Sequence, residues 1–125
     1  HRLESGREAT NRLLGFGERP TAIIYDNDVM ALAGLGVANV KGIAVPDELS
    51  LMSWDDSFMC TAAYPNLTAM GRNVVDTGKT AARLMLRLID GEKVGHIMGG
   101  AVRAACARIH WSRSRWGDER VVIAH

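Results

Sequence analysis

Two polar side chains, those of Asn27 and Asp55, each follow a short apolar stretch of the chain. The two stretches are Thr21–Asp26 and Leu49–Trp54. A carboxylate accepts hydrogen bonds strongly from hydroxyl groups, and an amide can both donate and accept them. The two residues could therefore bind a small ligand that carries several hydroxyl groups. The simpler alternative is that both residues only close turns or cap helices, because Asn and Asp favour such positions.

Three further carboxylates and one aromatic ring lie close to this pair in the sequence. The indole of Trp54 could stack on a sugar ring, although its position in an apolar stretch fits core packing equally well. Asp56 follows Asp55 directly, and Asp26 and Asp28 flank the other candidate. The central Gly and the closing Glu of an EF-hand calcium loop are missing. We therefore expect turns and caps here, and no metal.

The residue patterns of common enzyme sites do not occur in the chain. The four histidines do not have the spacing of a zinc-binding helix. There is also no phosphate-binding loop, no serine nucleophile elbow and no glycine pattern for a dinucleotide. We therefore expect a protein that is not an enzyme and that uses no cofactor.

Composition narrows the class of protein further. With 125 residues, 47% of them hydrophobic, the chain is long enough for one domain with a packed core. A net charge of +1 argues against a strongly basic nucleic-acid surface. The two cysteines, Cys60 and Cys106, make no disulfide framework and fit a reducing cytosol. Because no apolar run approaches the ~18 residues of a membrane span, we expect no contact with a membrane.

The elements that would position Asn27 and Asp55 form a strand–helix–strand unit. Both apolar stretches suit buried parallel strands. Between them, Val29–Val40 carries apolar residues at helical spacing, with Asp28 as the candidate N-cap and Gly42 as the end of the helix. Both strands would thus end in polar side chains at their carboxyl ends. In an open α/β sheet, ligands bind at that edge.

Helices and strands alternate along most of the chain, which predicts a parallel sheet with right-handed crossovers. The remaining elements that the pattern predicts are two amphipathic helices, a short helical turn, an extended segment and a last strand, at Glu4–Leu14, 73–90, Ser57–Ala63, Leu67–Met70 and Val121–Ala124. Asn73 is the candidate N-cap of the second amphipathic helix. Met30 is expected in the core.

Four ordered blocks of the chain resemble the sugar-sensing core of bacterial LacI/GalR-family transcription regulators. They are Arg19–Leu32, Gly42–Asp56, Tyr64–Thr68 and Gly78–Ala82. Several blocks in order are far more specific than one short motif. The resemblance implies an α/β fold with a three-layer parallel sheet, of the periplasmic-binding-protein-like type I. The chain begins without Met, so we expect it to be a fragment, the carboxyl-terminal part of that domain.

The resemblance also implies a function. Members of the family are cytoplasmic regulators, here expected to be a repressor, whose effector, a sugar, contacts the residues that match Asn27 and Asp55. Trp54 and Asp56 are further candidates for contact with the effector. A homodimer is implied, with Leu32 on the dimer face, and operator DNA would be bound only through an amino-terminal helix-turn-helix that is not in this chain. A sugar-binding protein of a transport system shares the fold and is the alternative.

The resemblance covers residues 5–92 and is lost after them. We therefore divide the chain into residues 1–92, the carboxyl-terminal part of a LacI-type effector-binding domain, and residues 93–125, a divergent tail. The tail is rich in Arg and contains Trp111 and Trp116. Basic residues beside aromatic rings can bind nucleic acid, but without a recognisable fold this signal is weak.

We predict that residues 93–125 are translated from a shifted reading frame and are poorly ordered. Codons permitted for Val102–Trp111, read one nucleotide later, can spell Ser-Glu-Leu-Arg-Val-Arg-Gly-Ser-Thr-Gly. This peptide resembles the strand and basic tail with which members of the family end. A shifted frame has no selected packing partners. Resequencing the gene between the codons for Asp90 and His96 should reveal the frame change. An intact frame there would leave a genuinely divergent tail.

Overall fold

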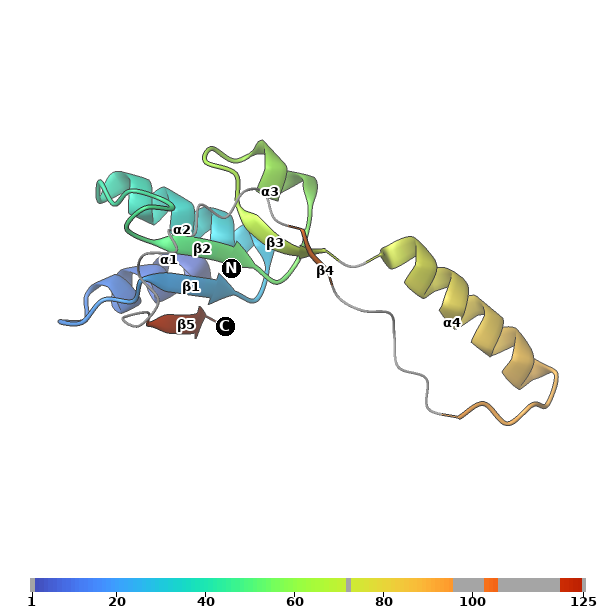
Figure 1. The fold of residues 1–125 in the computed structure, drawn as a ribbon. Helices are drawn as coiled ribbons and strands as arrows, with labels where there is room; N and C mark the ends of the chain where they lie inside the picture. Colours follow the sequence, from blue (N-terminus) through green and yellow to red (C-terminus); the bar gives the residue numbers. More distant parts are fainter. Residues whose placement is uncertain (1, 72, 96–102, 106–119, 125) are drawn as a thin grey trace. The chain divides into compact units, whose positions relative to one another are not determined.

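The computed structural model describes residues 2–71, 73–95, 103–105 and 120–124. The chain divides into two compact units. Unit 1 consists of His1–Gly71 and Ala104–His125, and unit 2 consists of Arg72–Arg103. Unit 1 contains most of a parallel sheet, and unit 2 contains one long helix (Figure 1).

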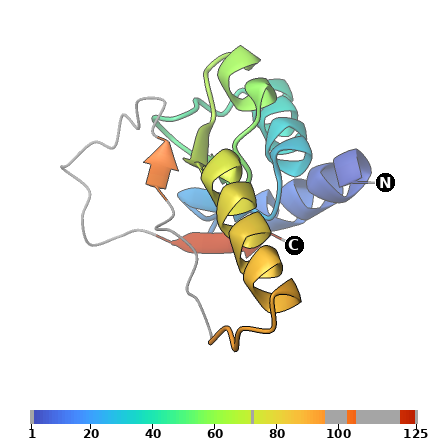
Figure 2. The same cartoon turned by 90° about the vertical axis from the view of Figure 1, so that its right-hand side faces the viewer.

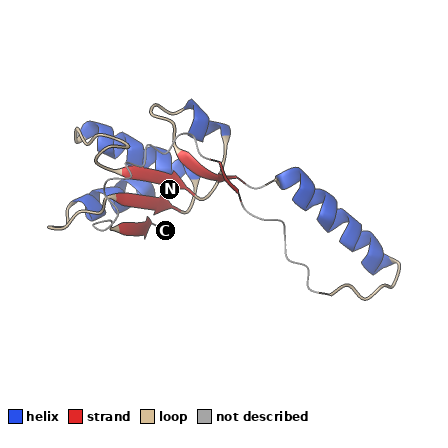
Figure 3. Cartoon of the chain, viewed as in Figure 1, coloured by secondary structure: helices blue, strands red, loops and turns tan. Residues whose placement is uncertain are grey.

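The sheet has five strands in the order β4-β3-β2-β1-β5. The pairs β1–β2, β1–β5 and β2–β3 are parallel, which confirms the predicted parallel sheet. Figure 3 distinguishes its strands from the helices by colour. The strands are β1 (Ala22–Tyr25), β2 (Ser50–Ser53), β3 (Thr68–Gly71), β4 (Arg103–Ala105) and β5 (Val121–Ala124). The helices that precede β3 in the chain are α1 (Arg2–Leu14), α2 (Asp28–Val40) and α3 (Phe58–Ala62).

The helices of unit 1 lie on one side of its sheet (Figure 2). Alternation along the strands places Ile23 and Tyr25 on that side, where both are fully buried, while Ile24 lies on the opposite side and is half-buried. The parallel sheet with packed helices confirms the predicted α/β class. A second helical layer is not seen among the described residues of unit 1. Met30 is 3% exposed, so its expected place in the core is confirmed.

A chain of buried hydrogen bonds joins α1 to β1. The Thr10 hydroxyl donates to the Gly6 carbonyl at 2.6 Å and lies 2.7 Å from the Tyr25 hydroxyl. Because a threonine hydroxyl has a single proton, Tyr25 must be the donor to Thr10. Burial raises the pKa of Tyr25, and the hydrogen bond with Thr10 partly opposes that rise. The tyrosine therefore stays protonated at neutral pH and keeps its donor.

Two glycines allow α1, α2 and β1 to approach this closely. A Cβ on Gly6 would lie 2.8 Å from the Cα and carbonyl oxygen of Met30, so the backbones of α1 and α2 meet there. A Cβ on Gly34 would lie 2.0 Å from the hydroxyl oxygen of Tyr25. Real Cβ atoms do not approach heavy atoms at such distances, because interiors are already close-packed. Glycine at these positions is thus required by packing.

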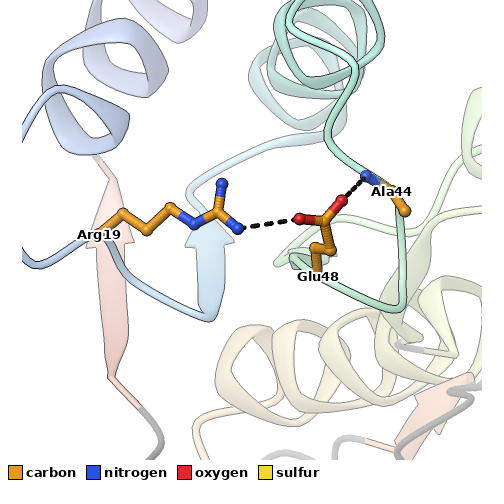
Figure 4. A network of polar contacts seen from close by, with 3 residues as sticks. All are labelled: Arg19, Ala44 and Glu48. Carbon is orange, nitrogen blue, oxygen red and sulfur yellow. Dashed lines mark hydrogen bonds and ion pairs between the residues drawn. The ribbon is translucent and has the colours of Figure 1, made fainter.

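An exposed ion pair links the segments that enter β1 and β2 at the amino edge of the sheet. Arg19 donates to one oxygen of the Glu48 carboxylate at 3.0 Å, and the Ala44 amide donates to the other at 2.9 Å (Figure 4). Both charged side chains are nearly half-exposed. An ion pair of this kind contributes about 0–1 kcal/mol, so it orders the turn before β2 more than it stabilises the fold.

Unit 2 is built on α4 (Val74–Ile89), a helix in which no residue is buried. Its N-cap is Asn73, whose side chain accepts from the Asp76 amide, as predicted. Several large apolar side chains of α4 are more than half-exposed, namely Val74, Val75, Met85, Leu86, Leu88 and Ile89. A surface helix normally turns such an apolar face toward a core.

The predicted strand at Val121–Ala124 is confirmed as β5, which pairs with β1. Most of the remainder of residues 93–125 lies outside the described residues. The shifted reading frame is therefore untested by the fold and stays a prediction.

Gly34→Ala should destabilise unit 1, because its Cβ would strike the Tyr25 hydroxyl. Overpacking of this kind costs about 1–3 kcal/mol in the free energy of unfolding. Gly36 lies on the same helix but is exposed, and a Cβ added there would meet nothing within 4 Å. Gly36→Ala is therefore the matched control and should be neutral or stabilise by up to about 1 kcal/mol through helix propensity. Urea unfolding followed by circular dichroism measures both, and equal effects would contradict the packing constraint.

Candidate functional site

The carboxyl ends of β1 and β2 lie side by side. Tyr25 is opposite Ser53 in the parallel register, and the Trp54 amide donates to the Tyr25 carbonyl at 2.9 Å. The pairing thus continues just beyond the two strands. Asn27 and Asp55 come two residues after these partners, so the structure places both at the same edge of the sheet.

Asn27 is the N-cap of α2 and is 6% exposed. Its backbone is extended, with φ −151°, and its side-chain oxygen accepts from the Met30 amide at 3.0 Å. The prediction of Asp28 as the N-cap is wrong, because Asp28 is already helical and its carboxylate accepts from the next amide, that of Val29, at 2.7 Å. The Asn27 side-chain nitrogen has no hydrogen-bond acceptor among the described residues.

Asp55 is half-buried and is held by its backbone. The Ser53 hydroxyl donates to the Asp55 carbonyl at 2.7 Å, and the Asp55 amide lies 3.2 Å from the same hydroxyl oxygen. The Cys60 thiol also points at this carbonyl, at 3.6 Å. Sequence reasoning did not single out Ser53, although serine hydroxyls are known to hydrogen-bond the backbone two residues further along.

The other candidates lie in different surroundings. Trp54 is 47% exposed, so its side chain is outside the core and the core-packing alternative is wrong. Asp56 is exposed next to it. Leu32 is half-buried and lines a separate groove of about 580 Å³ between α1 and α2, with Leu3 and Val40. The structure therefore does not bring Leu32 together with Asn27 and Asp55.

Within the described residues, no group of three or more His, Cys, Asp or Glu side chains gathers as a metal would require. In the same part of the chain, no helix is both long and apolar enough to cross a membrane.

Comparison with known proteins decides the family. The profile of the family described as periplasmic binding protein-like domain matches residues 2–98. The chain belongs to this family. Its relatives include catabolite control protein A of Priestia megaterium, 35% identical over 91 residues, and the regulator GalR of Escherichia coli, 38% identical over 92 residues. These matches span 73% and 74% of this chain but 27% of each relative, so the chain corresponds to about a quarter of their length.

Solved structures of family members agree with this assignment. A LacI family transcriptional regulator from Bifidobacterium animalis is 58% identical, with a TM-score of 0.79 over 82% of this chain and 38% of that one. The regulator CcpA of Lactococcus lactis is 27% identical, with a TM-score of 0.69, and covers 82% of this chain and 38% of that one. The relatives are transcription regulators of the LacI type. This favours the predicted regulator over a sugar-binding protein of a transport system.

Asn27→Ala should lower the free energy of unfolding by about 1 kcal/mol, because α2 loses its N-cap. Asn27→Ser is the control, since serine caps helices about as well as asparagine and also carries no charge into this buried position. Urea unfolding of unit 1 compares the two variants. If both lose stability equally, the buried amide acts through packing and not through the cap.

Proposed function

We propose that this chain forms part of the effector-binding domain of a LacI-type transcription regulator, a cytoplasmic repressor and not an enzyme. Its effector is a small molecule with hydroxyl groups, a sugar, bound beyond the carboxyl ends of β1 and β2. The observation that carries the proposal is the pairing of β1 with β2, which brings Asn27 and Asp55 to one edge. In open α/β sheets, ligands bind at the carboxyl ends of the strands.

The two residues have different roles in this proposal. The side-chain oxygen of Asn27 already accepts from the Met30 amide, so Asn27 offers the ligand its side-chain nitrogen as a donor. The carboxylate of Asp55 can only accept hydrogen bonds when ionised, and it would take them from hydroxyl groups of the ligand. Trp54, with its half-exposed indole, would stack on the ring, and Asp56 would add a second acceptor.

A sugar as effector is supported by the similarity to a known complex. The regulator CelR, solved in complex with cellobiose, is 29% identical to this chain, with a TM-score of 0.67 over 76% of this chain. A saccharide presents several hydroxyl groups, which fit a donor and an acceptor on neighbouring strands.

Action on DNA would require a second copy of the protein and a DNA-binding module outside these residues. Paired half-sites in DNA are bound by dimers. The groove between α1 and α2 supports a dimer face at Leu32, because Val40 beside it is 90% exposed and Leu3 is 42% exposed. Effector binding would favour one of two arrangements of the dimer, and its differential affinity for the two would change operator affinity.

Asp55→Ala, made in a regulator that spans the full length of the relatives and carries this sequence, should weaken saccharide binding by roughly 10- to 100-fold. That is the loss of about 1.5–3 kcal/mol from a hydrogen bond to a charged group. Operator affinity without saccharide should not change. Calorimetry with cellobiose and related saccharides measures the saccharide affinity, and a DNA-binding assay measures the operator affinity.

Asp47→Ala is the matched control, because Asp47 is exposed just before β2, at the opposite edge of the sheet. It should leave both affinities unchanged. Saccharide binding that survives in Asp55→Ala would overturn the proposed site. Binding lost equally in both variants would point to a loss of folding.

A further inference from the structure

Ser53 is fully buried, and its hydroxyl makes its hydrogen bonds to one residue, Asp55. Ser53 is 0% exposed, its hydroxyl donates to the Asp55 carbonyl at 2.7 Å, and its oxygen lies 3.2 Å from the Asp55 amide as acceptor. A buried hydroxyl without partners would be costly. Here both of its hydrogen bonds are made to the backbone of Asp55.

The Asp55 carbonyl has a second neighbour that can donate to it. The Cys60 thiol on α3 lies 3.6 Å from it and is 1% exposed. The backbone of Asp55 is thus held from the last residue of β2 and from the helix that follows. Ser57, which lies between them, caps α3 by accepting from the Met59 amide at 3.2 Å.

We propose that Ser53 is a positioning residue for Asp55. Its hydroxyl holds the Asp55 backbone in one conformation and thereby aims the Asp55 carboxylate at the carboxyl edge of the sheet. The inference rests on the proposed function, in which this carboxylate accepts from a ligand. Holding the group before the ligand arrives removes part of the ordering cost of binding.

The chain offers a matched pair of variants for the test. Ser53→Ala removes the hydroxyl and little else. Ser50→Ala makes the same change on the same strand, at a half-buried serine on the opposite side of the sheet. Hydrogen exchange of the Asp55 amide reports its hydrogen bond with Ser53 directly. The Ile23 amide, in the middle of β1, reports global unfolding.

A thiol reagent supplies a second and independent measurement. The buried Cys60 thiol contacts the same carbonyl, so its reaction with dithiobis-nitrobenzoate reports how often this segment opens. Cys106→Ala in all variants removes the other cysteine. Both measurements use the 125-residue chain without ligand, so they do not depend on whether the site binds a saccharide.

Ser53→Ala should speed Asp55 exchange and Cys60 labelling by about five-fold each, the effect of losing one hydrogen bond of ordinary strength. Ser50→Ala should change neither rate, and Ile23 exchange should rise less than Asp55 exchange in Ser53→Ala. Equal acceleration at Ile23 and Asp55, or no change at Asp55, would overturn the positioning role. Ser53→Thr restores the hydroxyl and, if it folds, should bring both rates back.

In the full-length regulator, Asp55→Ala should identify the saccharide whose binding depends on this carboxylate. Ser53→Ala should lower the affinity for that same saccharide by about five-fold. Weakening in Asp55→Ala alone would overturn the positioning role and leave the proposed site intact. If Asp55→Ala has no effect on saccharide binding, the proposed function fails, while the ligand-free exchange result still stands.

Discussion

The packing of the Tyr25 ring between α1 and α2 is the constraint on which unit 1 depends. The ring reaches from the end of β1 to Gly34 on α2, and its hydroxyl donates to Thr10 on α1. Three elements therefore meet at one side chain. Because the interior is close-packed, none of them can shift without opening a void or breaking a buried hydrogen bond. Nearer the start of α2, where Asn27 lies, the close approach of Gly6 to Met30 holds the same two helices together.

The sequence predicted the order and type of the elements well, since their signals are local. Apolar runs indicated β1 and β2, helical periodicity indicated α2, and Asn73 marked the start of α4. The N-cap of α2 was misassigned because Asn27 and Asp28 are both good caps. Only the backbone conformation distinguishes them, and it depends on where β1 stops pairing. The neighbour of β5 in the sheet was also beyond prediction, because a pairing across most of the chain leaves no local pattern.

The candidate site was predictable to the same extent. Parallel strands bring their carboxyl ends together, so the shared edge of Asn27 and Asp55 followed once both strands were recognised. The burial and hydrogen-bond partners of each side chain could not be predicted from the sequence in this way. For Trp54, only its exposure in the structure excluded a place in the core. The hydrogen bonds of Ser53 depend on a turn whose geometry a sequence does not show.

The contact between Tyr25 and Gly34 also restricts which sequences this architecture accepts. Position 34 can carry a Cβ only where position 25 carries a side chain too short to reach it, because the two compete for the same volume. A side chain at position 34, such as alanine, should therefore be accepted in evolution only together with a shorter, aliphatic residue at position 25. Residues in contact commonly vary in such pairs. As long as position 25 is tyrosine, position 34 must therefore remain glycine.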